Sequence, residues 1–247
     1  MKRIASEPLC RLIRFEASDG VELGGLLYEP AAKSKRAVLF LHGTGGSSIF
    51  DSGRTNILAA EFVRHGFAYF PFNNRGAHLS RRLKQRVKGK ARSISGGAAF
   101  ERIRDCVADI DGSITALRAR GYSEIYAIGH STGANKLAIY DTRKNRHSIR
   151  KLVFLAGGDD TGGIYQHLGE RRFRAAISKG REKIRAGDGE QMAPPSVSEM
   201  PMSWGSFVDM ANSDGDYNVF PFFEALNGVR LGRKPLFHHL EIGRAHV

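Results

Sequence analysis

The sequence predicts a mixed α/β fold, in which helices cover both faces of a mainly parallel sheet. Two patterns predict it. Short apolar runs bounded by turn residues alternate with helix-like stretches, as expected when crossover helices join parallel strands; the runs are residues 37–41, 67–72, 124–128 and 151–156. Between the second and third runs, apolar residues recur at alternating steps of four and three and mark one face of a helix: Ile103, Val107, Ile110, Ile114 and Leu117.

Ahead of these runs, a hairpin is predicted. Residues 12–15 and 21–28 flank Asp19-Gly20, a turn dipeptide that favours two antiparallel strands. Such a hairpin often edges an otherwise parallel sheet. The strand at 37–41 begins the parallel part, and the helix that follows the strand at 67–72 should end near Gly121 and cover the sheet. A further helix is expected at residues 134–140, before the strand at 151–156.

After Ala156 the pattern changes. Residues 157–201 contain many glycines, a basic helical stretch and the Pro194-Pro195 pair, with little strand signal. We interpret about 157–225 as a cap-like insertion over the strand ends, where loops usually shape a substrate pocket. Residues 1–240 are therefore predicted to form one domain with its core at 12–156, because sheet-and-helix domains of this length commonly stay undivided.

Composition narrows the class of protein. Of the 247 residues 41% are hydrophobic, yet no apolar run approaches the roughly 20 residues of a membrane helix. Glu7 stands where a signal peptide would need an apolar core, so we expect a cytoplasmic protein without membrane association. Cys10 and Cys106 are far apart and lack metal-type or redox-type spacing, which argues against a disulfide framework.

The chain is strongly basic, with a net charge of +13 and a pI of about 10.0. The cations gather in three clusters, at residues 75–92, 143–151 and 171–185. Because unpaired cations attract phosphate and carboxylate groups, the clusters form either solvated surfaces or contacts to an anionic partner. Aromatic residues that would support base stacking are sparse within them, which makes nucleic acid the weaker expectation.

The strongest chemical signal is Gly129-His130-Ser131-Thr132-Gly133. It fits the Gly-x-Ser-x-Gly pattern, in which a sharp strand-to-helix turn presents a serine Oγ. Small flanking residues are needed because the strained backbone passes close to its neighbours. A predicted strand directly precedes the motif and a predicted helix directly follows it, in the order that this turn requires. We predict that Ser131 is a nucleophile and that His130 is structural or lines a pocket.

A second element, His42-Gly43-Thr44-Gly45-Gly46, follows the first parallel strand. Acyl transfer places negative charge on the carbonyl oxygen of the substrate, and each backbone N–H aimed at that oxygen lowers the barrier by about 3–4 kcal/mol. We predict that the N–H groups of Thr44 and Thr132 form this oxyanion hole, because the glycines let the loop approach and the following helix adds a favourable dipole end. Asn74-Arg75-Gly76 is a third loop at the same edge.

These motifs, in this order, resemble the α/β-hydrolase superfamily over residues 12–156. Within it, the serine motif together with residues 155–160 (Leu-Ala-Gly-Gly-Asp-Asp) and 214–217 (Asp-Gly-Asp-Tyr) resembles a branch that includes fungal siderophore-cleaving esterases. The resemblance implies hydrolysis of an ester, thioester or amide through an acyl-enzyme, with no cofactor and no metal.

The chain departs from the superfamily pattern near its end. In that pattern an acid and then a histidine follow the nucleophile, each after a later strand. Residues 233–237 resemble the start of the strand that delivers the acid, and residues 241–247 resemble the translation of a sequencing adapter, that is, a non-native tail. We therefore expect a truncated chain whose last strands, acid and histidine are missing, and we give His246 no functional weight.

Candidates for the missing partners exist within the chain. Asp159 and Asp160 follow the strand after the nucleophile, where some serine hydrolases place the acid, but they could equally cap a helix. His238 and His239 are the candidates for the base. They follow the incomplete strand at once rather than after another helix and strand, which makes them the weaker pair.

The leading functional hypothesis is a serine hydrolase that acts on a small ester, thioester or amide. The basic clusters would suit an anionic substrate if they face the pocket, and the sequence does not decide this. A histidine would take the proton of Ser131, and water would later release the acyl group. Without its triad partners the chain should be weakly active or inactive. The alternatives are acyl transfer to another acceptor, an inactive homologue, and a protein that binds nucleic acid or another polyanion, whose affinity would fall steeply with salt.

Overall fold

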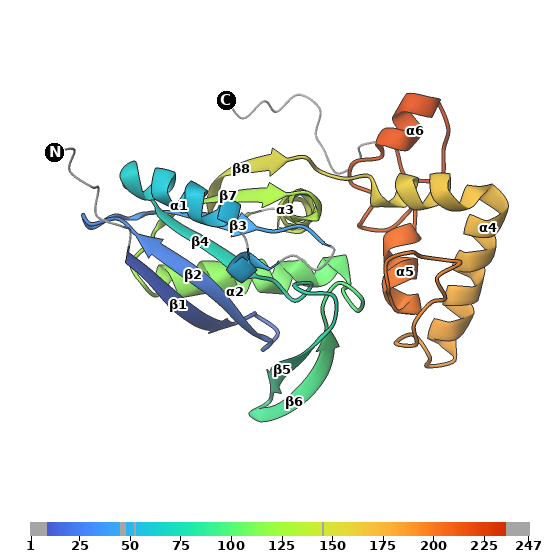
Figure 1. The fold of residues 1–247 in the computed structure, drawn as a ribbon, viewed down its shortest axis with the longest axis horizontal. Helices are drawn as coiled ribbons and strands as arrows, with labels where there is room; N and C mark the ends of the chain where they lie inside the picture. Colours follow the sequence, from blue (N-terminus) through green and yellow to red (C-terminus); the bar gives the residue numbers. More distant parts are fainter. Residues whose placement is uncertain (1–8, 45–47, 52, 145, 236–247) are drawn as a thin grey trace.

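A six-stranded sheet forms the centre of the computed structural model, which describes residues 9–44, 48–51, 53–144 and 146–235 (Figure 1). Its order is β1-β2-β4-β3-β7-β8. The strands are β1 (Leu9–Glu16), β2 (Glu22–Glu29), β3 (Arg36–Leu41), β4 (Ala68–Asn73), β7 (Glu124–His130) and β8 (Ile149–Leu155). β1 pairs antiparallel with β2, and β2 pairs antiparallel with β4, whereas β4, β3, β7 and β8 run parallel. All six predicted strands are present, and the predicted fold class is confirmed.

Helices cover both faces of the sheet, as predicted. One face packs against α1 (Gly53–Arg64), which follows the 3-10 turn η1 (Ile49–Asp51), through a small cluster around Tyr28, Val38 and Tyr69. The other face packs against α2 (Cys106–Arg118) and α3 (Thr132–Arg143). The predicted helix at 103–117 begins as the 3-10 turn η2 (Ile103–Asp105) and continues into α2.

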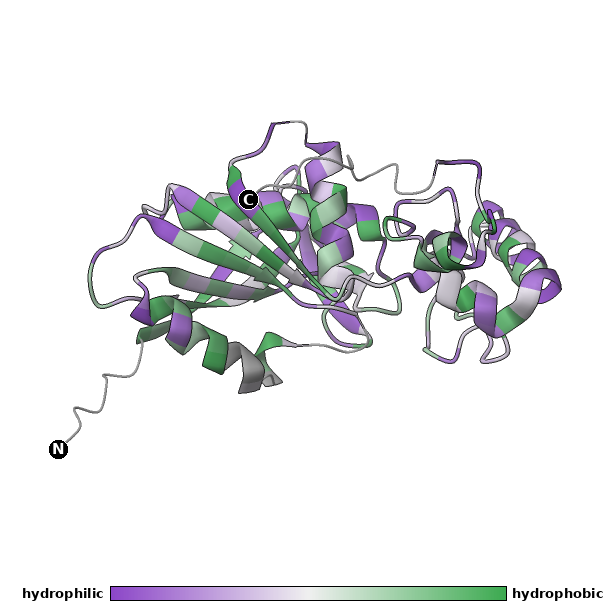
Figure 2. Cartoon of the chain, turned by 90° about the horizontal axis from the view of Figure 1, so that it is seen from above, coloured by the Kyte–Doolittle hydropathy of each residue, from purple (hydrophilic) through white to green (hydrophobic). Residues whose placement is uncertain are grey.

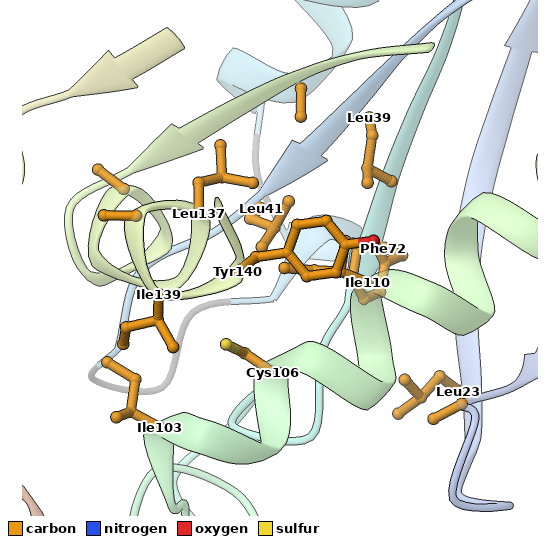
Figure 3. Packing of buried hydrophobic residues seen from close by; sticks show 14 of the residues in the cluster. Leu23, Leu39, Leu41, Phe72, Ile103, Cys106, Ile110, Leu137, Ile139 and Tyr140 are labelled. Carbon is orange, nitrogen blue, oxygen red and sulfur yellow. The ribbon is translucent and has the colours of Figure 1, made fainter. Parts of the chain in front are cut away.

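The larger of the two cores lies beneath α2 and α3. Figure 3 shows Leu39, Leu41 and Phe72 of the sheet meeting side chains from the two helices: Cys106, Ile110, Leu137, Ile139 and Tyr140. Burying a leucine, isoleucine or phenylalanine side chain contributes about 1.5–3 kcal/mol. This packing fixes α3, and therefore the turn at its start, against the ends of β3 and β7.

The sequence did not reveal a second, two-stranded sheet. β5 (Arg81–Val87) and β6 (Lys90–Gly96) form a hairpin that projects from the main sheet (Figure 1). Lys88 and Gly89 both have positive φ, which is typical of a two-residue type I′ turn. The hairpin could not be predicted because Lys-Gly is not one of the dipeptides typical of such a turn, and because its strands are rich in cations rather than apolar residues.

The hairpin changes the interpretation of the basic cluster at residues 75–92. Much of its charge is exposed, as a solvated surface would be, but Arg86 pairs with Glu16 and Lys84 with Glu22 of the neighbouring strands. For Arg75 the prediction of a solvated or partner-binding cation is wrong, because its side chain is only 9% exposed. Its guanidinium group holds three carboxylates, Asp19, Asp105 and Asp109, and so ties the β1–β2 turn to α2.

Helices follow β8, beside the ends of the strands (Figure 1): α4 (Asp160–Arg185), α5 (Trp204–Ala211) and α6 (Phe222–Asn227). The segment joins the sheet domain through hydrogen bonds such as Ser203 N–H to the carbonyl of Ala99 (2.7 Å) and the amide of Ile103 to Asp209 (2.8 Å). No strand of the main sheets lies in it, in keeping with the weak strand signal. The boundaries of the domain and its insertion remain predictions.

Figure 2 shows hydrophilic and hydrophobic residues alternating along the strands and mixed on the helices after β8. Within the described residues, no helix is both long and apolar enough to cross a membrane. Cys10 is exposed and Cys106 buried, and both are free thiols.

Candidate active site

Ser131 lies at the turn between β7 and α3 in a strained conformation, with φ 56° and ψ −130°. Such a conformation costs about 1–3 kcal/mol in a residue other than glycine and persists only where its surroundings enforce it. The surroundings are tight. A Cβ atom on Gly129 would overlap the carbonyl of Gly133, and one on Gly133 would overlap the carbonyl of Leu41. The two glycines of the motif are therefore needed for the turn to close.

Hydrogen bonds on both sides hold this turn. The N–H of Ser131 donates to the carbonyl of Leu155 at the end of β8 (2.9 Å), and its own carbonyl accepts from the amide of Ala134 (2.8 Å). Ser131 is half-buried and the adjacent His130 is exposed. A Cβ atom on Gly43 would lie 3.1 Å from the Oγ of Ser131, so the loop after β3 runs directly beside the hydroxyl.

The two predicted oxyanion donors flank this serine. Thr132 is buried and is the first residue of α3, so its N–H has no partner within the helix. Thr44 is half-buried and follows Gly43 along the loop beside Ser131. Gly45 and Gly46 of the same motif lie outside the described residues. The role of both amides remains a prediction.

His42 fixes the loop after β3. Its Nδ1 lies 2.6 Å from the carbonyl of Gly43, and its Nε2 accepts from the N–H of Asn74 (3.3 Å), which assigns the ring proton to Nδ1. Burial and the charge of Lys136 lower the pKa of His42 to about 3. Carbonyl and N–H point in opposite directions across a planar trans peptide, so holding the Gly43 carbonyl also sets the direction of the Thr44 N–H.

A buried ion pair lies behind this loop. Lys136 and Glu101 are 0% and 2% exposed, and their Nζ and Oε1 atoms are 2.5 Å apart. The same Nζ donates to Oδ1 of Asn74 (3.1 Å), which also accepts from the amide of Gly76 (3.0 Å). Sequence patterns missed this network. Its only signal is a lysine among the apolar residues of the helix after Ser131, and its partners come from two distant loops.

The structure separates the two candidate acids. Both carboxylate oxygens of Asp159 are engaged, since Oδ1 accepts from the amide of Gly162 at the start of α4 and Oδ2 from the amide of Phe223, each at 2.7 Å. Asp159 is thus a helix cap, the alternative that its sequence position left open. The Oδ2 of Asp160 is buried and has no hydrogen-bond partner among the described residues. Burial, with the charge of Asp159, raises the pKa of Asp160 to about 6.

The remaining predicted residues have other partners or lie outside the described chain. Asp216 accepts hydrogen bonds from Arg104 and Arg143, each at 2.7 Å, and Asp214 accepts from the backbone of the 233–234 turn. The aspartates of residues 214–217 therefore organise the chain around the insertion. His238 and His239 lie outside the described residues, so the structure places neither of them.

With this geometry established, comparison with known families is informative. Residues 32–174, more than half of the chain, match the family described as serine aminopeptidase, S33. The chain belongs to this family. The match extends from just before β3 into α4, and so contains the Ser131 turn and the loop beside it. Comparison with curated proteins gave no significant match.

Solved structures share the fold of this S33-family chain at low identity. Siderophore hydrolase EstB from Aspergillus fumigatus is 15% identical, with a TM-score of 0.57 over 89% of this chain and 70% of that one. The α/β-hydrolase GrgF from Penicillium sp. sh18 is 14% identical, with a TM-score of 0.52 over 89% of this chain and 67% of that one. A thermostable carboxyl esterase from Bacillus coagulans is also 14% identical, with a TM-score of 0.52 over 77% of this chain and 55% of that one. The chain thus spans little more than half the length of the carboxyl esterase, and 56% of an esterase from Pyrococcus furiosus.

Proposed function

We propose that this S33-family protein hydrolyses a carboxylic ester, thioester or amide through an acyl-enzyme on Ser131. The observation that carries the proposal is the strained turn at Ser131, with the Gly43 loop beside its Oγ. Strain of this kind is concentrated at functional sites, where it presents a reactive group. The carboxyl esterase from Bacillus coagulans, which shares the fold, supports an ester as the first substrate to test.

The proposed reaction has two halves. Oγ of Ser131 attacks the carbonyl carbon while a histidine accepts its proton, and the oxyanion is stabilised by the amides of Thr44 and Thr132. Collapse expels the alcohol, thiol or amine with that proton, and water then hydrolyses the acyl-enzyme. His42 is unsuited to act as this base, because it is buried and neutral and both ring nitrogens already have partners.

Asp160 is the better proposal for the acid that orients the histidine. Asp159 is already bonded to two backbone amides, whereas Asp160 keeps an oxygen without a partner among the described residues. Both aspartates line a cavity of about 310 Å³ beside Met200, Met202 and Met210, so the unpartnered oxygen alone distinguishes Asp160.

Labelling with a fluorophosphonate tests the nucleophile directly. Mass spectrometry of the digested protein should find one adduct, on the peptide that contains Ser131, and Ser131→Ala should abolish it. Ser123→Ala is the matched control, because Ser123 is exposed at the opposite end of β7 and should not affect labelling. Labelling that persists in Ser131→Ala would contradict the proposal, and so would the absence of labelling in a protein that includes the acid and histidine of the superfamily pattern.

The acid is tested by comparing two variants with 4-nitrophenyl acetate. Loss of the triad acid typically lowers turnover by about 10⁴-fold, so Asp160→Asn should lower kcat far more than Asp159→Asn, which retains a capping side chain. If the two variants lose activity equally, or if only Asp159→Asn does, Asp160 is not the acid. Circular dichroism of both variants controls for loss of the fold.

A further inference from the structure

A large cleft in the insertion takes no part in the chemistry proposed above. It has a volume of about 1150 Å³ and lies between α4 on one side and residues 212–214 and 229–233 on the other. We call it the cap cleft. Ser131 is not among its lining residues. The basic cluster at residues 171–185, which the proposed reaction does not use, supplies one of its walls.

The cap cleft is cationic, and most of its charge is unpaired. Five arginines line it from both walls: Arg174, Arg181, Arg185, Arg230 and Arg233. Its two acids are already engaged, since Glu170 pairs with Arg174 (2.8 Å) and Asp214 accepts from the backbone amides of the 233–234 turn. Within the described chain, no ion pair or side-chain hydrogen bond involves the guanidinium groups of Arg181, Arg185 or Arg230.

Apolar side chains alternate with these cations. Along α4 the cleft is lined at steps of three and four by Arg174, Ile177, Arg181 and Ile184, so one helix face presents both kinds of group over about 16 Å. Ile184 is 40% exposed, and Val229 on the opposite wall is 37% exposed. The mixture of hydrophilic and hydrophobic residues on these helices is visible in Figure 2.

We propose that the cap cleft binds an amphipathic carboxylate, an anion that carries a hydrocarbon chain, as a fatty acid does. Guanidinium groups held near one another repel, and a bound carboxylate relieves that repulsion while accepting charge-assisted hydrogen bonds. The hydrocarbon chain would cover the exposed isoleucine and valine, which a small hydrated anion would leave in water. Recognition of this kind needs both the charge and the chain of the ligand.

Nucleic acid fits the cleft less well. Its aromatic residues, Tyr165 and Phe173, pack edge to face against each other at 5.2 Å, and Phe173 is buried, so its ring is not free to stack on a base. The walls instead present aliphatic surface between the cations. An amphipathic carboxylate uses both features of these walls.

Isothermal titration calorimetry with decanoate tests the proposal, with acetate and decan-1-ol as probes that lack the chain or the charge. Decanoate should bind at one site, and the other two probes at least tenfold more weakly. Ser131→Ala should bind decanoate equally well, which separates this site from the proposed reaction. Acetate or decan-1-ol binding as tightly as decanoate would overturn the proposal.

Matched variants on one helix locate the binding. Arg181→Gln removes a cation of the cleft and should weaken decanoate binding several-fold, whereas Arg171→Gln removes another exposed cation of α4 that does not line it. Ile184→Ser should also weaken binding, with Leu226→Ser, at an exposed leucine outside the cleft, as its control. Equal affinity in Arg181→Gln and Arg171→Gln, or tighter binding of a single-stranded oligonucleotide that depends on Arg181, would refute a carboxylate site here.

Discussion

Replacing Lys136 by methionine probes the buried ion pair behind the Ser131 turn. Lys136→Met leaves the carboxylate of Glu101 buried without a counter-charge and takes a donor from Asn74. Breaking a fully buried pair from one side costs about 3–5 kcal/mol. Folded domains are stable by only about 5–15 kcal/mol, so the variant should lose a large part of the stability of the protein.

The loss of stability in Lys136→Met should come mainly from the unpaired buried carboxylate of Glu101. A double substitution that removes both charges tests this. In Lys136→Met with Glu101→Met no unpaired charge remains. The residual cost should fall to about 0.5–1.5 kcal/mol, the contribution of one hydrogen bond, because the Oδ1 of Asn74 still accepts from the amide of Gly76. Urea unfolding followed by circular dichroism measures all four proteins of the cycle. Lys179→Met removes a cation that pairs with Glu182 on the surface and should change stability within experimental error. If Lys136→Met costs no more than Lys179→Met, or if the two single effects simply add, the buried-pair argument fails.

Three further predictions concern charge and the sheet edge. Burial lowers the pKa of His42 to about 3 in the folded protein, against about 6.5 when unfolded, so the neutral ring contributes stability that is complete above pH 6.5 and lost as the pH falls toward 3. Urea unfolding of His42→Gln should show a shallower loss of stability between pH 6.5 and 4, and an unchanged slope would exclude a neutral buried ring. Asp160 affects stability with the opposite sign, since its raised pKa means that the folded protein loses stability as the pH rises from about 4 to 6. Asp160→Asn should therefore be stabilised by at most about 3 kcal/mol at pH 7, while Asp159→Ala should lose about 1–2 kcal/mol with its helix cap. Stabilisation by both substitutions in urea unfolding would contradict the different contacts of the two aspartates. Phe154 is 38% exposed on β8, the edge strand of the described sheet, and an exposed apolar edge favours pairing between copies of the chain. We therefore expect self-association in sedimentation velocity that Phe154→Lys reduces; a protein that sediments as a monomer, or association that Phe154→Lys leaves unchanged, would show that this edge takes no part.

The main sheet could be predicted because its strands are apolar and its helices periodic. Residues 37–41 and 124–128 are bounded by turn residues, and burial on both faces gives parallel strands this continuous apolar character. The β5–β6 hairpin obeys neither rule. Its outer face carries arginines and lysines, its turn is Lys88-Gly89, and it is held by contacts to Asp19 and Gly20 that lie more than 60 residues away in the sequence.

In the candidate site, too, the features set by local sequence could be predicted and those set by tertiary contacts could not. The Ser131 motif could be found because one local turn imposes its glycines, and the structure shows the close contacts that require them. Asp159 and Asp160 stand side by side in the sequence, and only tertiary contacts make one a helix cap and leave the other with an unpartnered oxygen. Burial of Lys136 likewise results from packing between α3 and two loops, which no periodic pattern encodes.

Lys136 also connects the stability of this region to its proposed chemistry in a way that can be dissected. Its charge is one cause of the low pKa of His42, so Lys136→Met should raise that pKa toward 6.5. At pH 8 the ring would still be neutral and could still hold the carbonyl of Gly43. If Lys136→Met remains folded yet labels more slowly with the fluorophosphonate at pH 8, protonation of His42 cannot be the reason. The defect then comes from the two contacts that Lys136 loses, to Glu101 and to Asn74, whose backbone amide positions His42.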